Sequence, residues 1–379
     1  MSNIIVLGAG MVGSAMALDL VKNHTVTVTD LSQAVLDKVQ SRDNNLQTQV
    51  LDVTEIESVK RAILPFDLVV CAVPGFLGFN TLKAIIESKK DVVDISFFPE
   101  NALELDALAK QHGVTAIVDC GVAPGMDNII LGYYDTQLKV TDFECLVGGL
   151  PKQKKWPFNY KAPFSPIDVI EEYTRPARYV ENGQIIVREP LTDCEYVEFD
   201  NIGTLESFNS DGLRSIIETM PHIPNMKEKT LRYPGHVEYI KVLKETGFFS
   251  IDSIQVNGVE VKPIQFTSQL LFKEWKLGEE EPEITVMRVT VKGYDNNIKS
   301  LTIQYDLYDE YDETTKTSSM ARCTGYTATA AANMVLQGLF KSKGVFPPEL
   351  IGKHKDCFTF ILEYLAERGV RYNKTTRVD

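Results

Sequence analysis

The fold is decided near the N-terminus by the sequence Gly8-Ala9-Gly10-Met11-Val12-Gly13, which follows the short apolar run from Asn3 to Leu7. Residues 14–22 then place apolar side chains at helical spacing, and the β-branched run from Thr25 to Thr29 leads directly into Asp30. A strand, a glycine turn, a helix, a second strand and an acid in this order form one complete βαβ unit. The acid lies 22 positions after Gly8, a spacing that is typical of a dinucleotide-binding turn.

The same alternation of apolar strands and amphipathic helices continues over the first third of the chain. We expect strands at 47–51, 68–73, 91–95 and 114–118, and helices at 54–63, 78–88 and 103–112. The strand at 68–73 is apolar throughout, as expected for a strand that is covered on both faces. The pattern therefore predicts an α/β fold, with a Rossmann-type doubly wound parallel sheet and helices on both faces.

The sequence changes character after Gly125. A helix is expected at 126–138, and β-rich segments with turn sequences such as Asn257-Gly258 follow it. Two more amphipathic helices are expected near the C-terminus. We predict that residues 126–321 form an inserted, mainly antiparallel α+β domain. Residues 1–125 and 322–379 are then the dinucleotide-binding domain, to which the C-terminal helices return.

Each glycine of the motif has a physical role in holding a pyrophosphate. Gly8 permits the tight turn, Gly10 lets the pyrophosphate approach the backbone, and Gly13 lets the helix pack closely on the strand. The start of the helix, at Met11 and Val12, supplies free N–H groups and a partial positive charge for the phosphates. These residues are therefore predicted to bind the cofactor.

Asp30 favours NAD over NADP, because its carboxylate would repel a 2′-phosphate and residues 31–33 bring no cation. It is expected to accept hydrogen bonds from the adenosine ribose diol. The alternative is that the glycines form only a tight turn and that Asp30 caps a helix. Asp52 and Val53, which follow the third strand, are expected near the adenine, although Asp52 is equally well explained as an N-cap.

Ligands of open α/β sheets bind beyond the carboxyl ends of the strands. We therefore expect the dinucleotide and the substrate near residues that follow the later strands, namely Ala72, Val73, Pro74, Ser96 and Gly121. Asp94 and Asp119 are the acids at these strand ends, and either is a candidate to hold a substrate ammonium or to act as a base. The alternative role of both is to cap the loop that follows.

Four further segments resemble a known family, the saccharopine dehydrogenase and lysine 6-dehydrogenase superfamily. They are residues 103–115, the glycine-proline signature at 121–128, the segment Thr230-Leu231-Arg232-Tyr233-Pro234-Gly235-His236, and residues 344–349. The resemblance covers nearly the whole chain in the same order, and the matches outside the βαβ unit are specific. It implies a Rossmann domain completed by C-terminal helices, and a second domain that closes over the substrate and often mediates dimerisation.

The activity that this resemblance implies is NAD(P)-dependent oxidation of the C–N bond of a small amino-acid substrate, and the closest member type is lysine 6-dehydrogenase. Saccharopine-forming enzymes tend to have an acid at the position of Ala123 and a tyrosine at that of Phe97. A saccharopine dehydrogenase-like enzyme is therefore the alternative, and a non-catalytic NAD-binding regulator is another. We expect a homo-oligomer, either a dimer or a larger assembly.

The family-like segments also supply candidate substrate-binding residues. Arg232 is the first choice to clamp a substrate carboxylate, because guanidinium donors can bind a carboxylate in parallel. His236 is a candidate proton relay, and Tyr160 and Ser165 are candidate contacts in a segment that also resembles the family pattern. The alternatives are an ion pair for Arg232 and a purely structural role for His236.

Composition limits the partners and the compartment. The chain has 379 residues, of which 44% are hydrophobic and 24% charged, as in an ordinary globular protein. Its 52 acidic and 39 basic residues give a net charge of −13, which disfavours nucleic acid and membranes as partners. No apolar run could span a bilayer and no signal-peptide pattern precedes the first strand, so a cytoplasmic protein is expected. The cysteines form no Cys-x-x-Cys pair, so we expect no metal site.

Overall fold

The computed structural model describes residues 1–163, 166–278 and 280–378. Its contacts divide the chain into two compact units. The first unit comprises Met1–Lys139, Tyr294–Ile298 and Met320–Tyr372, and the second comprises Val140–Gly293, Lys299–Ser319 and Asn373–Asp379.

The first unit is built on a seven-stranded sheet with the strand order β17-β6-β5-β4-β1-β2-β3. Every pair of neighbouring strands in it runs parallel. The strands are β1 (Asn3–Leu7), β2 (Thr25–Asp30), β3 (Gln47–Val50), β4 (Leu68–Cys71), β5 (Asp91–Asp94), β6 (Thr115–Ile117) and β17 (Gly344–Phe346). This order confirms the predicted doubly wound parallel sheet. The sequence pattern missed β17, which is only three residues long.

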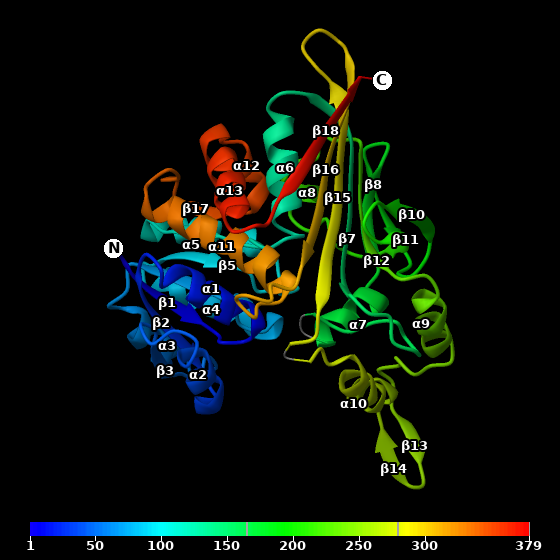
Figure 1. The fold of residues 1–379 in the computed structure, drawn as a ribbon, viewed down its shortest axis with the longest axis horizontal. Coiled ribbons are helices and arrows are strands. Elements are labelled where there is room, and N and C mark those ends of the chain that lie inside the picture. The colour runs from blue at the N-terminus through cyan, green and yellow to red at the C-terminus, as the bar shows by residue number, and fades with distance from the viewer. Residues whose placement is uncertain (164–165, 279, 379) are drawn as a thin grey trace. The chain divides into compact units, whose positions relative to one another are not determined.

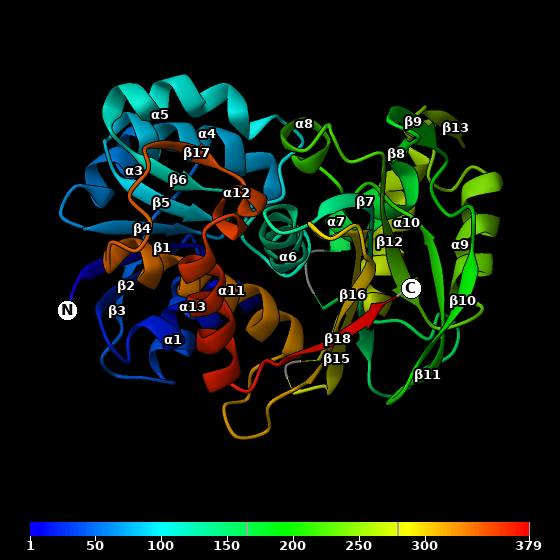
Figure 2. The same ribbon diagram turned by 90° about the horizontal axis from the view of Figure 1, so that it is seen from above.

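Helices cover both faces of this sheet (Figure 2). The helices of the first unit are α1 (Met11–Leu20), α2 (Gln33–Gln40), α3 (Ile56–Ile63), α4 (Gly75–Glu87), the 3-10 turn η1 (Ala102–Leu105), α5 (Asp106–His112), α6 (Met126–Asp135), α11 (Ser319–Leu336), α12 (Pro348–Gly352) and α13 (Lys355–Glu367). Alternate strand residues such as Ile5, Leu7 and Val69 join a buried apolar cluster with Leu82 and Ile85 of α4. The interior strands are apolar because both faces of the sheet are covered.

The C-terminal helices return to the first unit, as predicted. Asp19 on α1 is fully buried and accepts hydrogen bonds from the Arg368 guanidinium, the Tyr364 hydroxyl and the Thr329 hydroxyl. A buried carboxylate needs such partners, because an unpaired charge in the interior is costly. These bonds fix α11 and α13 against the glycine-loop helix.

Two boundaries of the units differ from the expected residues 126 and 322–379. Helix α6 belongs to the first unit, where the buried Asn128 amide donates to Glu349 of α12 at 2.9 Å. The chain beyond Asn373 belongs to the second unit, because β18 (Tyr372–Val378) lies beside β16 (Ser300–Glu310) in its sheet. Both departures depend on long-range pairing that the local sequence pattern does not display.

The second unit contains a nine-stranded sheet in which β10-β11-β12-β7-β15-β16-β18 follow one another and β8 and β9 pair to the side. Its remaining strands are β7 (Lys139–Pro151), β8 (Ala177–Glu181), β9 (Gln184–Arg188), β10 (Glu195–Phe199), β11 (Gly203–Asn209), β12 (Asn225–Arg232) and β15 (Glu283–Tyr294). The sheet is mixed, because β12 runs parallel to β7 and antiparallel to β11. The predicted α+β class is therefore confirmed, and β7 and β12 form a parallel pair within this sheet.

Asparagine-glycine turns form hairpins in the second unit. Asn182 and Gly183 have φ angles of 50° and 74° between β8 and β9. Asn257 and Gly258 have φ angles of 50° and 81° between β13 (Ile254–Val256) and β14 (Val259–Val261). Asparagine and glycine tolerate positive φ, which the tightest hairpin turns require.

The helices of the second unit are α7 (Pro166–Thr174), α8 (Ile216–Thr219), α9 (His236–Glu245) and α10 (Pro263–Trp275), drawn in green to yellow-green in Figure 1. Residues of α7, α9 and α10 join one buried apolar cluster. A second buried cluster is formed by strand residues such as Leu146, Leu205 and Val286. Among the described residues of both units, none of the helices is both long and apolar enough to cross a membrane.

Candidate functional site

The glycine loop between β1 and α1 has the geometry that the motif predicts. Gly8 has a φ of +99°, and its N–H donates to the Thr29 carbonyl at 2.9 Å. A Cβ at Gly8 would lie 2.5 Å from the Ala72 carbonyl oxygen, and a Cβ at Gly13 would lie 2.0 Å from the Gly8 carbonyl oxygen. A side chain at either position would displace the loop or the helix.

Helix α1 begins directly behind this loop. Gly10 is its N-cap residue and brings no side chain to cap the helix, and Met11 and Val12 form its first turn. A Cβ built at Gly10 would meet no atom of the described chain within 4 Å, so the backbone is open to a close ligand. Uncapped N–H groups at a helix start favour an anion such as a phosphate. The residues present therefore fit the pyrophosphate of a dinucleotide.

Asp30 at the end of β2 lies beside the glycine loop. Its Oδ2 accepts from the Ala9 N–H at 3.0 Å, and its Oδ1 accepts from the Ser32 N–H at 2.9 Å. The side chain is partly exposed, and each carboxylate oxygen has a second acceptor position. The loop thus holds an acid in the place expected for a ribose diol.

The Asp52 carboxylate forms hydrogen bonds within its own turn. Its Oδ1 accepts from the Thr54 N–H at 2.9 Å and from the Thr54 hydroxyl at 2.6 Å. These bonds lower the pKa of Asp52 and hold the turn before α3. This geometry favours the capping interpretation of Asp52 over a contact with the adenine.

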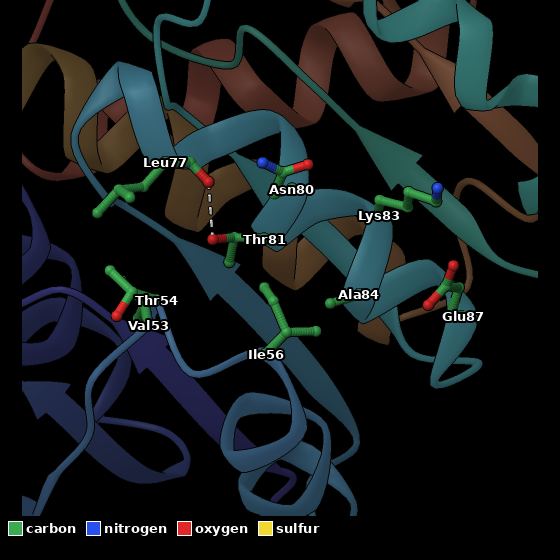
Figure 3. Close-up of a pocket in the computed structure, with 9 residues that line it drawn as sticks. All are labelled: Val53, Thr54, Ile56, Leu77, Asn80, Thr81, Lys83, Ala84 and Glu87. Carbon is green, nitrogen blue, oxygen red and sulfur yellow. Dashed lines mark hydrogen bonds between the residues drawn. The ribbon is translucent and has the colours of Figure 1, made fainter.

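Val53 instead lines an open cavity of about 410 Å³ between the start of α3 and the length of α4 (Figure 3). The other lining residues are Thr54, Ile56, Leu77, Asn80, Thr81, Lys83, Ala84 and Glu87. Leu77, at the start of α4, and Val53 bring apolar surface to the end nearest the strand termini, whereas Glu87 marks the far end of the helix. A flat apolar ring such as adenine suits the end formed by Val53 and Leu77.

The remaining cofactor candidates of the first unit follow β4. The Ala72 N–H continues the pairing of β4 by donating to the Leu7 carbonyl at 2.8 Å, and Pro74 is the N-cap residue of α4. Val73 is buried, whereas Pro74 is exposed. Ala72 also lies under Gly8 and Gly13, so this strand end forms the floor of the glycine loop.

Asp94 at the end of β5 is fully buried, with no exposed surface. Its Oδ1 accepts from the Ser96 N–H at 2.6 Å, and its Oδ2 meets no hydrogen-bond partner among the described residues. Burial raises the pKa of Asp94 to about 7, although the hydrogen bonds from Ser96 lower it. The capping role is thus visible in one oxygen, while the other is an unsatisfied buried acceptor.

Asp119, Ser96 and Cys71 surround Asp94. The charge of Asp119 adds to the rise in the pKa of Asp94, and the Cys120 N–H donates to the Asp94 carbonyl at 3.1 Å. Asp119 itself is nearly buried and has a φ of +53°, an uncommon conformation for a residue other than glycine. Burial also raises the pKa of the Cys71 thiol well above its usual value.

The glycine-proline signature forms a closed loop after β6. The Gly121 N–H donates to the Pro124 carbonyl at 3.1 Å, and the Met126 N–H donates to the Gly121 carbonyl at 3.1 Å. Gly125 has a φ of +145°, and a Cβ there would lie 1.9 Å from the Gly121 carbonyl oxygen. Only glycine fits at position 125. This requirement fixes the backbone conformation of the loop that follows Asp119.

In the second unit the structure brings Tyr160, Arg232 and His236 together, but it buries them. The Arg232 guanidinium donates to Glu172 at 2.6 Å, to Tyr173 at 3.2 Å, to Tyr160 at 3.3 Å and to the Leu231 carbonyl at 2.9 Å. Its side chain is only 2% exposed. Burial would lower the pKa of Arg232, but the two tyrosines and Glu172 raise it overall. This geometry does not support the predicted clamp for a substrate carboxylate.

His236 is part of the same buried cluster. Its Nδ1 lies 2.9 Å from the Phe158 carbonyl, which can only accept, so Nδ1 carries the hydrogen. Its Nε2 then accepts from the Tyr173 hydroxyl at 2.9 Å. Burial, together with the charge of Arg232, lowers the pKa of His236 to about 3. A histidine held neutral in this way is structural and does not support the predicted proton relay.

Ser165, the remaining substrate candidate, lies outside the described residues. Sequence analysis did not single out Glu172 and Tyr173, which complete the cluster around Arg232. Tyr160, Glu172 and Tyr173 lie 59 to 72 positions before Arg232 in the chain. No local pattern could have joined them.

Two family models match the chain. The model of the saccharopine dehydrogenase NADP binding domain matches residues 4–117, and that of the saccharopine dehydrogenase C-terminal domain matches residues 121–370. The parallel sheet and its glycine loop define a dinucleotide-binding α/β protein, and the first unit binds a pyridine nucleotide. More narrowly, the chain belongs to the saccharopine dehydrogenase family.

Several curated proteins are similar to the chain. Saccharopine dehydrogenase [NADP(+), L-glutamate-forming] of Saccharomyces cerevisiae is 25% identical over 71% of this chain and 62% of its own length. Alpha-aminoadipic semialdehyde synthase of Mus musculus is 22% identical over 99% of this chain and 48% of its own length. Carboxyaminopropylagmatine dehydrogenase of Synechocystis sp. is 21% identical over 92% of both chains. The chain thus spans only about half to two thirds of the first two relatives.

Solved structures show the same fold. The structure of apo saccharopine dehydrogenase (L-Glu forming) from Saccharomyces cerevisiae has a TM-score of 0.81 at 19% identity and covers 100% of both chains. Homospermidine synthase from Legionella pneumophila, in complex with NAD, has a TM-score of 0.67 at 11% identity and covers 99% of this chain and 91% of its own. At these identities the likeness concerns the fold.

Proposed function

We propose that the chain is an NAD-dependent oxidoreductase that acts on the C–N bond of an amino acid, in the manner of a lysine 6-dehydrogenase. The observation that carries the proposal is the glycine loop with Asp30 bonded to the Ala9 N–H, in a chain of the saccharopine dehydrogenase family. The bound nicotinamide would accept a hydride from the carbon beside the amine. The residues of this chain would bind the dinucleotide and would accept the proton that the substrate ammonium loses.

The preference for NAD rests on charge. Asp30 presents a carboxylate where NADP would place its 2′-phosphate, and residues 31–33 are Leu, Ser and Gln. Two anions at hydrogen-bond distance repel strongly in a partly buried site. The matching family model is described as an NADP binding domain, so the direct comparison of the two cofactors is the sharpest test of this part of the proposal.

The proposed proton chemistry belongs to the ends of β5 and β6. A substrate ammonium must lose its proton for the imine to form, and an adjacent acid favours the positive charge of that imine. Asp119 and Asp94 are the candidates. Because Asp94 is fully buried and bonded to the Ser96 N–H, we assign it the supporting role. Burial raises the pKa of Asp94 to about 7, so this carboxyl group can exchange a proton near neutral pH.

The proposal includes two candidate substrate classes. The departures at Ala123 and Phe97 count against a saccharopine substrate but do not identify another one. The likeness to saccharopine dehydrogenases makes a saccharopine dehydrogenase-like enzyme the second candidate. A clamp at Arg232 is not needed for either, since its donors are already bonded.

The test is reduction of NAD and NADP by the purified chain with lysine, saccharopine and a panel of amino acids and polyamines. We expect turnover of one amino-acid amine with NAD as the better cofactor. Asp30→Asn should lose that preference, while Asp37→Asn, an exposed acid on the neighbouring α2, should keep it. NAD binding without turnover of any amine would contradict the proposed activity and favour a regulator. Equal affinity for NADP would contradict the role of Asp30.

A further inference from the structure

The methionines of the chain differ sharply in their exposure to solvent. Of the nine, the following are buried, with at most 6% of their surface exposed: Met16, Met126, Met220, Met226, Met287, Met320 and Met334. The terminal Met1 is 98% exposed, and Met11 is 47% exposed. Within the described chain, Met11 is therefore the one methionine beyond the N-terminus that a dissolved oxidant can readily reach.

Met11 lies at the start of the helix behind the glycine loop. It is the first residue of α1 and directly follows the N-cap Gly10, where a Cβ would meet no atom of the described chain within 4 Å. The next side chain, Val12, is packed into the fold, because its Cγ1 lies 3.4 Å from the position that a Cβ would take at Gly325 of α11. Met11 is instead exposed beside the open backbone, where the phosphates of a bound nucleotide are expected.

Oxidation would change what this side chain offers to a ligand. The sulfur of a thioether is a weak hydrogen-bond acceptor, whereas a sulfoxide is polar and its oxygen carries partial negative charge. In the reaction with a peroxide, the sulfur gives an electron pair to one peroxide oxygen and the O–O bond breaks. An S=O bond forms, and the departing hydroxide takes the remaining proton. The sulfur is thus oxidised, and the peroxide is reduced to water.

A sulfoxide at Met11 would compete with the nucleotide for the same donors. Gly10 brings no side-chain cap, so the first N–H groups of α1 are left for a phosphate. The methionine side chain is unbranched and flexible, and its sulfoxide oxygen could turn back onto these N–H groups. The partial negative charge of that oxygen would also repel the diphosphate at short range. Neither effect acts on the unoxidised thioether.

We propose that Met11 is a site of reversible oxidation through which peroxides control the binding of the pyridine nucleotide. The inference rests on nucleotide binding at the glycine loop and goes beyond it. Methionine sulfoxide is reduced by dedicated reductases, which makes the modification reversible. The cysteines are poorer targets, because five of the six are buried and the sixth, Cys194, is half-buried. Burial also raises the pKa of the Cys194 thiol and so disfavours its reactive thiolate.

The test is the affinity of the full chain for NADH before and after treatment with hydrogen peroxide, measured by fluorescence titration. Peptide mass spectrometry locates the oxidised residues. Oxidation of Met11 should weaken NADH binding at least about tenfold, as expected when a charge-assisted hydrogen bond is lost. Met11→Leu removes the sulfur, so peroxide should leave the affinity of this variant at its own untreated value. Cys194→Ser should respond to peroxide as the unaltered chain does.

Two further measurements separate Met11 from other targets of the oxidant. Saturating NAD should slow the oxidation of Met11, because the bound dinucleotide covers the start of α1. Methionine sulfoxide reductases should restore NADH binding, whereas dithiothreitol alone should not. Circular dichroism checks that the treated chain and the variants are folded.

Three results would overturn the proposal. They are unchanged NADH affinity in a chain whose Met11 is fully oxidised, an equal loss of affinity in Met11→Leu, and recovery with dithiothreitol alone, which would assign the effect to a cysteine. An untreated chain that does not bind NADH would instead refute the nucleotide site, and the proposal with it. That failure is distinguishable because it appears before any oxidant is added.

Discussion

Asp94 provides a stability measurement that tests the electrostatics at the end of β5. The carboxyl group is fully buried, one oxygen accepts the Ser96 N–H, and the other has no hydrogen-bond partner among the described residues. Burial raises the pKa of Asp94 from 3.8 to about 7. Asp94→Asn retains an acceptor for the Ser96 N–H and removes the ionisable group. The substitution should therefore stabilise the protein at alkaline pH.

The magnitude follows from linkage. Between about pH 4 and pH 7 the folded state holds a proton at Asp94 that the unfolded state has released. The free energy of unfolding therefore falls as the pH rises through this window and levels off above it. A difference of about three pKa units corresponds to about 4 kcal/mol. Relative to the unaltered chain, Asp94→Asn should gain up to about 4 kcal/mol between pH 4 and pH 8, because asparagine does not ionise.

The assay is urea unfolding of both proteins at half-unit steps from pH 4 to pH 8.5, with the difference in the free energy of unfolding plotted against pH. Asp37→Asn, in which an exposed acid is changed, serves as the control and should run nearly parallel to the unaltered chain. If the curve for Asp94→Asn also runs parallel, Asp94 is ionised in the folded protein at neutral pH. The account of its burial would then be refuted.

Three further predictions concern Asp30, Arg232 and His236. Asp30→Ala should weaken NADH binding at least about tenfold in calorimetric titration, because it removes the acceptors for the ribose diol; unchanged affinity would exclude Asp30 from the site. Arg232→Met should lower the free energy of unfolding by about 3–5 kcal/mol, because Glu172 loses its buried partner, while KM measured on folded protein stays unchanged; a KM rise without destabilisation would restore the clamp. The pKa of His236 is lowered to about 3 from 6.5, so the folded state binds fewer protons than the unfolded state below pH 6.5 and loses stability in acid. His236→Gln should flatten the fall of the melting temperature between pH 6.5 and pH 4, and an unchanged slope would count against a neutral His236.

The first unit could be predicted from sequence because its determinants are local. The apolar run, the glycines and Asp30 lie within one βαβ unit. Each of these residues contacts residues that are close in the sequence or that lie at the end of the adjacent strand. The strands β17 and β18 were not predicted. Each is short or exposed, and each is defined by pairing with a distant strand rather than by a pattern of its own.

The second unit could be predicted only in part. The asparagine-glycine turns were visible, because positive φ is a local demand that few residues meet. The ion pair of Arg232 could not be predicted, because its partner Glu172 lies 60 positions earlier in the chain. A guanidinium in a family-like segment is equally compatible with a substrate clamp and with a buried ion pair. Only the three-dimensional partners distinguish the two.

Asp30 was predicted to bind the cofactor and Arg232 to bind the substrate. The hydrogen bonds of the two side chains explain why the structure supports the first prediction and not the second. A carboxylate has about four acceptor positions, and the Ala9 and Ser32 N–H groups occupy two of those on Asp30. Asp30 can therefore hold the glycine loop and still accept from a ribose. A guanidinium has five donors, and contacts to Glu172, Tyr160, Tyr173 and the Leu231 carbonyl engage four of those on Arg232. A ligand carboxylate would have to replace Glu172 inside a buried aromatic cluster. Asp30 is partly exposed and has acceptor positions left, which supports a binding role. Arg232 is buried and most of its donors are already bonded, which supports a structural role.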